Sequence, residues 1–314
     1  MDLSSEDWMA SLPEELWDVP LSNLAIPGSH DAMTYCLDCC CSPLVPSEPD
    51  NLRLLDRLFP CITRPFIIKW ATTQYKSIEE QLSMGIRYFD FRIAHKPNDS
   101  SNDLYFKHAI YTHLTAQETL QSVASWLHAH PKEVVILACS HFEGMTYELH
   151  QAFVSTLNKL FDSKLCPWTE TVLTLRSLWK SGYQVILSYD YHGKALNEDE
   201  LWPAIPYWWA DQPTAKGVIT YLESKKNQGR PGDFFVAGLN LTTDRSYIVE
   251  HICQSLRTLT FSNWESLQKW LKDQQPGSSP KSLNIIAGDF LGPLPLCPLV
   301  IALNQKLLKK NCIR

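Results

Sequence analysis

Short apolar segments alternate with amphipathic segments along almost the whole of this 314-residue chain. The apolar segments are continuous rather than alternating in polarity, which is typical of strands buried on both faces of a parallel sheet. About eight such strands separated by helices predict an α/β fold, a (β/α)8 barrel. The predicted strands are Leu24–Ile26, Arg87–Ile93, Leu104–Phe106, Val134–Cys139, Tyr183–Tyr189, Tyr207–Ala210, Phe234–Leu239 and Leu283–Gly288.

Two of the predicted helices begin with a capping box, in which a hydroxyl residue precedes a glutamate by three positions. Ser77 and Glu80 form one pair, and Thr115 and Glu118 form the other. The predicted helices are Ser77–Met84, Thr115–His130, Gln151–Phe161, Thr174–Lys180, Ala215–Asn227, Ser246–Leu256 and Asn263–Lys272. An open doubly wound sheet is the alternative fold. No glycine-rich phosphate loop follows the first strand, so a nucleotide-binding version of that sheet is disfavoured.

Composition and charge exclude several function classes. The formal net charge is −6, and nucleic-acid binding usually needs a basic footprint, so no nucleic-acid partner is predicted. The first residues, Met1–Asp7, are acidic and lack the apolar core of a signal peptide. Ten cysteines without such a signal predict reduced thiols and a cytoplasmic location. Cys39–Cys41, with Cys36 nearby, are compatible with metal binding, with palmitoylation or with no role at all.

Polar residues follow the predicted strands at their carboxyl ends, where the active site of a barrel lies. They are His30, Asp31, Asp90, Arg92, His108, Ser140, His141, Tyr189, Asp190 and Asp289. Two histidines on different strands can act as general base and general acid, because imidazole titrates near neutral pH. An arginine between them can hold a phosphate and stabilise charge on its oxygens. The set predicts phosphoryl transfer on a substrate whose own hydroxyl attacks the phosphodiester.

Each of these residues also has a structural interpretation. Asp90 and Arg92 can form a buried ion pair inside the barrel. Asp31 can make an Asx turn after Pro27-Gly28. The aromatic run Pro206–Trp209 is typical of a core or a pocket wall. Only the joint occurrence of the histidines, the arginine and the aspartates favours a site.

Three motifs resemble the X region of phosphatidylinositol-specific phospholipases C: Ile26–Asp31 (IPGSHD), Gln81–Arg92 (QLSMGIRYFDFR) and Leu104–His108 (LYFKH). The chain is similar to the small, X domain-containing members of that family. The resemblance covers nearly the whole chain. It implies an irregular TIM (β/α)8 barrel, a single domain over 1–314, and an X-region core at about 20–195.

The family has a calcium-dependent and a metal-independent version. In the calcium enzymes an Asn follows the first histidine, and acidic ligands occupy the later motifs. Here those places are held by Asp31, Asp90, Arg92 and, by a less certain alignment, Ser140. Calcium prefers six to eight oxygen ligands, and an arginine cannot be one of them. The chain is therefore similar to the metal-independent version, and no calcium, other metal or cofactor is expected.

The resemblance implies a role for each catalytic candidate. His30 takes the proton from the inositol 2-hydroxyl, which attacks the phosphorus. Arg92 stabilises the non-bridging oxygens, and His108 protonates the leaving diacylglycerol oxygen. Asp31 supports His108, and Asp289 supports His30. Substrate-binding candidates are Asp90, Tyr189, Trp208, Trp209 and Asp211, because aromatic side chains can stack on a sugar-like ring.

The resulting hypothesis is a phosphoric diester hydrolase that cleaves phosphatidylinositol-type lipids to diacylglycerol and inositol (cyclic) phosphate. Its partner is phosphatidylinositol or a related lipid at a membrane surface that it visits transiently. One alternative is a headgroup-binding protein with the same barrel and weak or no turnover. A related phosphodiesterase acting on glycerophospho-compounds or sphingomyelin is a third, although such enzymes usually hold Mg²⁺ with acidic residues, and Arg92 argues against it.

Overall fold

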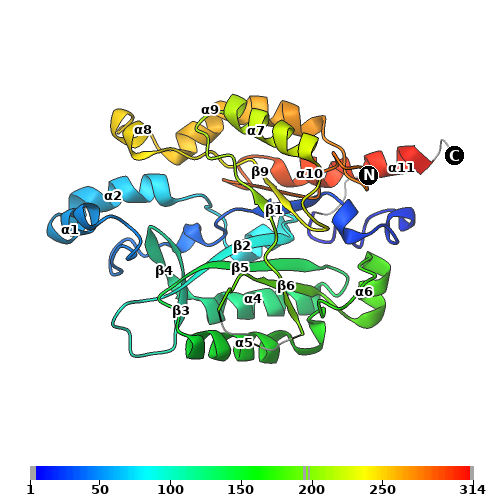
Figure 1. The fold of residues 1–314 in the computed structure, drawn as a ribbon, viewed down its shortest axis with the longest axis horizontal. Helices are drawn as coiled ribbons and strands as arrows, with labels where there is room; N and C mark the ends of the chain where they lie inside the picture. The colour runs from blue at the N-terminus through cyan, green and yellow to red at the C-terminus, as the bar shows by residue number, and fades with distance from the viewer. Residues whose placement is uncertain (1–4, 194–195, 197–198, 312–314) are drawn as a thin grey trace.

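Eight parallel strands form a curled sheet with helices on its outside (Figure 1). The computed structural model describes residues 5–193, 196 and 199–311, with the side chains of 309–311 left out. Neighbouring strands follow the order β7-β6-β5-β2-β1-β10-β9-β8, and every pair in it is parallel. The strands are β1 (Ile26–Ser29), β2 (Tyr88–His95), β5 (Val135–Glu143), β6 (Val185–Tyr189), β7 (Leu201–Trp202), β8 (Tyr207–Trp208), β9 (Val236–Gly238) and β10 (Ile285–Gly288).

The barrel is irregular in two places. The predicted strand Leu104–Phe106 belongs to β3 (Leu104–His108), which pairs antiparallel with β2 and with β4 (Ile110–Thr115), so it is a hairpin outside the ring. The sequence did not predict β7. No strand pairing among the described residues joins β7 to β8, and the ring is open there. The predicted α/β barrel is confirmed, but with a different set of eight strands.

Most predicted helices are present, and both capping boxes at Ser77 and Thr115 are formed. The stretch predicted as one helix, Ser246–Leu256, instead holds all but the first residue of a short α8, a non-helical segment at 251–255 and the first residue of a separate α9. Two helices that the sequence did not predict, α1 and α2, precede α3. The helices are α1 (Asp50–Leu58), α2 (Pro60–Ala71), α3 (Ile78–Ser83), α4 (Ala116–Ala129), α5 (Tyr147–Phe161), α6 (Leu175–Ser181), α7 (Ala215–Gln228), α8 (Arg245–Glu250), α9 (Leu256–Lys272), α10 (Leu296–Leu303) and α11 (Gln305–Asn311).

Two separate cores lie on the two faces of the sheet. Successive side chains of a strand point to opposite faces, so Tyr88 lies in one core and Phe89 in the other. The inner core fills the barrel with residues such as Ile136 and Val236, together with the N-terminal residues around Trp8. The outer core joins the sheet to its helices, with α4 and α5 along one side and α7, α9 and α10 along the other (Figure 1).

The amino-terminal edge of the barrel is held by a fully buried ion pair. Arg87 Nη2 lies 2.8 Å from Glu133 Oε2, and neither side chain is exposed. The Glu133 carboxylate also accepts a hydrogen bond from the backbone N–H of Ala10 at 3.0 Å. This pair therefore ties the N-terminal residues to the start of β2 and β5. No helix among the described residues is long and apolar enough to span a membrane.

Candidate active site

The chain turns sharply after β1 and presents two ionisable residues at the carboxyl edge of the sheet. The prediction that this strand ends at Ile26 is wrong, because β1 runs through Pro27 and Gly28 to Ser29. Gly28 allows close packing: a Cβ there would lie 3.0 Å from Tyr88 Cδ1, closer than ordinary van der Waals contact. His30 follows the strand, and Asp31 then adopts a left-handed φ of 43°. Aspartate tolerates this conformation better than most residues, so the turn can aim both side chains inward.

Two buried residues after α2 hold this turn in place. Thr73 Oγ1 donates to the Asp31 carbonyl at 3.1 Å. Gln74 Nε2 donates to the carbonyls of His30 at 2.9 Å and Gly288 at 3.0 Å. Both side chains are fully buried. Sequence reasoning did not single out Thr73 or Gln74, since neither lies in a motif and no helix was predicted before them.

The protonation of His30 follows from its contacts. Nδ1 lies 2.8 Å from Asp289 Oδ1, and a carboxylate accepts hydrogen bonds, so Nδ1 carries a proton and donates. Nε2 is therefore the basic nitrogen, and it lies 3.2 Å from Arg92 Nη2. Burial alone would lower the pKa of His30, but the charges of Asp31 and Asp289 outweigh it, so the pKa is raised above 6.5.

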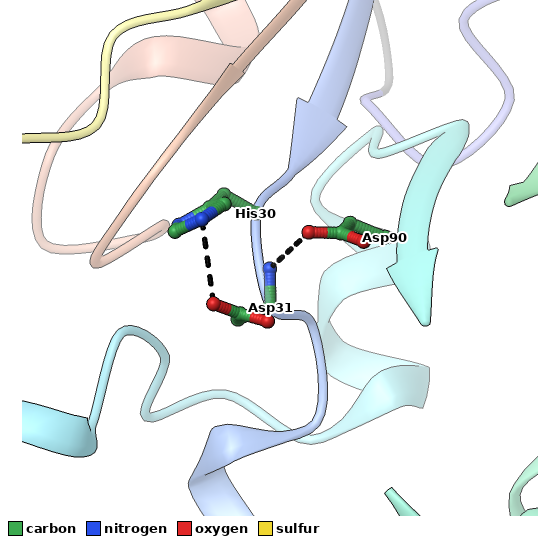
Figure 2. A group of neighbouring side chains, drawn as sticks. All are labelled: His30, Asp31 and Asp90. Atoms are coloured by element: carbon green, nitrogen blue, oxygen red, sulfur yellow. Dashed lines mark hydrogen bonds and ion pairs between the residues drawn. The ribbon is translucent and has the colours of Figure 1, made fainter. Parts of the chain in front are cut away.

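Asp31 lies between the two histidines and the arginine. Its Oδ1 is 2.6 Å from Arg92 Nε, and its Oδ2 is 3.3 Å from His30 Nε2 and 3.5 Å from His108 Nε2. Figure 2 shows this carboxylate facing His30, with the Asp31 backbone N–H donating to Asp90. Burial would raise the pKa of Asp31, yet Arg92 and the histidines hold it below its usual value. A charged Asp31 therefore favours protonation of the His30 imidazole.

His108 extends from the β3 hairpin toward the same point. Its Nδ1 lies 2.5 Å from the carbonyl oxygen of Ala71, at the end of α2. A carbonyl can only accept, so Nδ1 carries a proton and Nε2 faces Asp31. This arrangement suits a general acid, because a proton taken up by Nε2 would point into the site.

A metal ion does not fit this site well. His30, Asp31 and Asp90 offer ligand atoms that lie within 4.8 Å of one another. The guanidinium of Arg92, however, contacts Asp31 at 2.6 Å and lies 3.5 Å from Asp90, so it already supplies the compensating positive charge. Among the residues that the structure describes, only these three converge there, whereas calcium prefers six or more oxygens. The geometry favours the arginine over a divalent cation.

These residues line a cavity of about 680 Å³ at the carboxyl edge of the sheet. Of the predicted substrate-binding residues, Asp90 and Trp209 line it. Tyr189, Trp208 and Asp211 do not, and for these three the predicted position in the pocket wall is wrong. Asp211 is exposed, and the other two belong to the outer core.

The alternation of strand side chains explains these errors. On β8, Trp208 points outward and contacts Phe235, whereas its neighbours Tyr207 and Trp209 line the cavity. On β6, Tyr189 points outward and its hydroxyl lies 2.8 Å from His150 Nδ1. A continuous apolar run does not reveal which residues face inward.

The neighbours of Tyr189, namely Ser188 and Asp190, face the cavity instead. His141 also lines the cavity, beside a bulge in the pairing of β2 with β5, and it has a φ of 50°. Burial, then the charge of Arg92, lowers the pKa of His141. The sequence placed His141 at a strand end without giving it a role.

Comparison with known proteins identifies the family. The family model described as PI-PLC X 1 matches residues 66–232. PI-PLC X domain-containing protein 1 of Danio rerio is 50% identical over 302 residues, which cover 96% of this chain and 97% of the relative. The chain belongs to the PI-PLC X domain family. The family prediction is thus confirmed, and the human protein 1 shares 47% identity over 97% of this chain and 94% of its own length.

Solved structures of bacterial phospholipases share the fold. The phosphatidylinositol-specific phospholipase C from Listeria monocytogenes superposes with a TM-score of 0.66 at 20% identity, covering 96% of this chain and 99% of that enzyme. A Staphylococcus aureus phosphatidylinositol-specific phospholipase C gives a TM-score of 0.67 at 16% identity, covering 95% and 97%. At these identities the likeness concerns the fold, and it confirms the TIM barrel.

Proposed function

We propose that this protein is a phosphoric diester hydrolase that cleaves phosphatidylinositol-type lipids without a metal ion. The observation that carries the proposal is the convergence of His30, Arg92 and His108 around the Asp31 carboxylate, inside one cavity. An internal phosphoryl transfer needs a base, an acid and a cation for the phosphate oxygens, and this site offers one of each.

The proposed reaction begins with His30 in its neutral form. Its Nε2 removes the proton from the 2-hydroxyl of the inositol ring while the hydroxyl oxygen attacks the phosphorus. Asp289 on Nδ1 keeps the ring oriented and stabilises the imidazolium as it forms. Arg92 replaces its present contact with His30 Nε2 by contacts with the non-bridging oxygens, where negative charge grows.

The bond to diacylglycerol then breaks as His108 donates the proton on its Nε2 to the leaving oxygen. The products are diacylglycerol and inositol 1,2-cyclic phosphate. The same histidines in exchanged roles can open the cyclic ester with water. Tyr207 and Trp209 on one wall of the cavity provide apolar faces for the inositol ring. In this proposal the protein works in the cytoplasm and reaches its substrate at a membrane surface.

The proposal is tested with purified protein and vesicles that contain phosphatidylinositol, in EDTA and in added Ca²⁺. We expect diacylglycerol release in both conditions and a cyclic phosphate signal by ³¹P NMR. The control is His30→Ala, which removes the proposed base. Release no greater than that of His30→Ala would reject the proposed function, and release only with Ca²⁺ would reject the metal-free mechanism.

A headgroup-binding protein with weak or no turnover is the second candidate, and the ion pairs that occupy Arg92 are the observation behind it. Asp31, Asp90 and Asp190 line the cavity, and Arg92 is the only arginine or lysine among the described residues that line it. Two of these carboxylates contact Arg92, which must release them to engage a phosphate fully. Vesicle binding by His30→Ala at wild-type level, together with no turnover by the wild type, would identify this function.

A further inference from the structure

Three consecutive cysteines project from a hydrogen-bonded turn into solvent. Cys39, Cys40 and Cys41 all have exposed side chains. The Asp38 carboxylate holds the turn by accepting from the backbone N–H of Cys41 at 2.9 Å and from the Ser42 hydroxyl at 2.7 Å. The thiols of Cys39 and Cys40 lie 3.6 Å apart. The turn therefore presents a cluster of accessible thiols that contribute nothing to the core.

The cysteine turn is attached to the hairpin formed by α1 and α2. Arg64 of α2 donates to the carbonyl of Ser42 at 2.7 Å. The same guanidinium pairs with Asp56 of α1 at 2.5 Å, and both of these side chains are largely buried. Arg64 thus joins the cysteine turn to both helices, and this contact fixes the position of the thiols relative to the hairpin.

The α1–α2 hairpin exposes five large apolar side chains. Their exposed fractions run from 47% to 70%, which is unusual for so many leucine, isoleucine and phenylalanine residues in one short segment. The set comprises Leu54, Leu55, Leu58, Phe59 and Ile62. Exposed Arg57 and Lys69 flank it, and Asp50 is the only exposed acidic residue of the two helices. Apolar side chains with a basic surround match an anionic lipid surface.

The hairpin is continuous with the cavity of the candidate active site. Trp70, near the end of α2, lines that cavity. The backbone carbonyl of the next residue, Ala71, accepts a hydrogen bond from His108 Nδ1. Trp70 also makes an edge contact with Tyr247 of α8, the helix that carries the exposed Val249. In Figure 1, α1, α2 and α8 lie together at one end of the barrel. A bilayer in contact with the hairpin would therefore meet the mouth of the cavity.

We propose that the Cys39–Cys41 turn is an S-acylation site whose acyl chains, with the α1–α2 hairpin, anchor the protein on a bilayer. The acyl donor is a long-chain acyl-coenzyme A. A cysteine sulfur attacks the thioester carbonyl, a new C–S bond forms, and coenzyme A leaves as a thiol with the displaced proton. No oxidant is needed. Stable anchoring takes two signals, and here the acyl chain and the apolar hairpin supply them.

The test is a count of thioesters on the full chain expressed in mammalian cells. Free thiols are blocked, thioesters are cleaved with neutral hydroxylamine, and the released thiols are tagged with a maleimide that adds mass. We expect a hydroxylamine-dependent shift in the wild type and its loss in the Cys39→Ser/Cys40→Ser/Cys41→Ser variant. Cys253→Ser, which removes another exposed thiol, is the matched control and keeps the shift.

Membrane fractionation supplies the second readout. We expect the triple serine variant to lose at least tenfold in its membrane-to-soluble ratio, and His30→Ala to keep both the shift and the ratio. Because His30→Ala abolishes only the proposed catalysis, failure of the hydrolase proposal leaves this test intact. Absence of a hydroxylamine-dependent shift in the wild type, persistence of the shift in the triple variant, or a signal released only by a disulfide reductant would overturn the inference.

Discussion

Replacing Glu133 by glutamine tests how much the buried ion pair at the amino-terminal edge contributes to the fold. The substitution keeps the shape of the side chain but removes its charge. Arg87 would then be a fully buried cation without a counter-charge, because neither side chain of the pair is exposed. Breaking a buried pair by removing one partner costs about 3–5 kcal/mol, since the remaining charge stays desolvated.

The expected change in melting temperature follows from the size of the chain. An unfolding entropy of about 2.1 cal/mol/K per residue, summed over 314 residues, is roughly 0.7 kcal/mol/K. A loss of about 3–5 kcal/mol therefore lowers the melting temperature by roughly 5–8 °C. Differential scanning calorimetry measures this shift directly. Specific activity at 25 °C is expected to stay unchanged, because the pair lies at the edge of the sheet opposite the cavity.

Glu14→Gln is the matched control for Glu133→Gln. Glu14 pairs with Arg176 at 3.1 Å, but its side chain is 69% exposed, and surface pairs contribute only about 0–1 kcal/mol. The control should therefore lower the melting temperature by no more than about 2 °C. If Glu133→Gln behaves like Glu14→Gln, the desolvation reasoning is wrong. A double-mutant cycle with Arg87→Met measures the coupling energy of the pair. The losses of unfolding free energy in the two single variants should not add in the double variant, because each single change already breaks the same contact.

Three further predictions concern the site and its support. In Asp289→Asn the pKa of His30 falls toward its ordinary value, because the substitution removes a negative charge that raises it. Activity that needs neutral His30 therefore persists to lower pH. If the acid limb of the pH–rate profile stays at the same pH as in the wild type, this reasoning is wrong. His108→Ala should lower turnover of phosphatidylinositol at least a hundredfold with little change in vesicle binding, and a near-wild-type rate would reject its role as the acid. Gly28→Ala should lower the free energy of unfolding, measured in urea, by about 1–3 kcal/mol, because the new methyl group contacts Tyr88. An unchanged free energy of unfolding would mean that the neighbouring strands shift to accommodate the methyl group without cost.

The strand ends were the most predictable part of the site. A residue that follows a buried parallel strand lies at the carboxyl edge of the sheet, whatever the order of the other strands. His30 and Asp289 could therefore be expected at the same edge. They do meet, at 2.8 Å. Pocket walls were less predictable, because Tyr189 and Trp208 lie within strands whose inward face depends on register.

The residues that hold the site in place were not predictable from local patterns. Thr73 and Gln74 reach the β1 turn from the end of α2, more than 40 positions along the chain. His108 is oriented by the backbone carbonyl of Ala71. Every residue has such a carbonyl, so the residue type at position 71 does not predict this contact. Such contacts depend on the path of the backbone and not on residue identity.

The sequence alone determined the class of fold and the catalytic candidates, because the period of apolar residues and the residues after each strand are local properties. Tertiary structure decided that β3 leaves the ring, which side chains line the cavity, and that Asp31 contacts three partners at once. These outcomes depend on distances between segments far apart in the chain. Neighbouring charges then outweigh burial: the same histidine and aspartate types acquire raised or lowered pKa values only when the barrel brings them together.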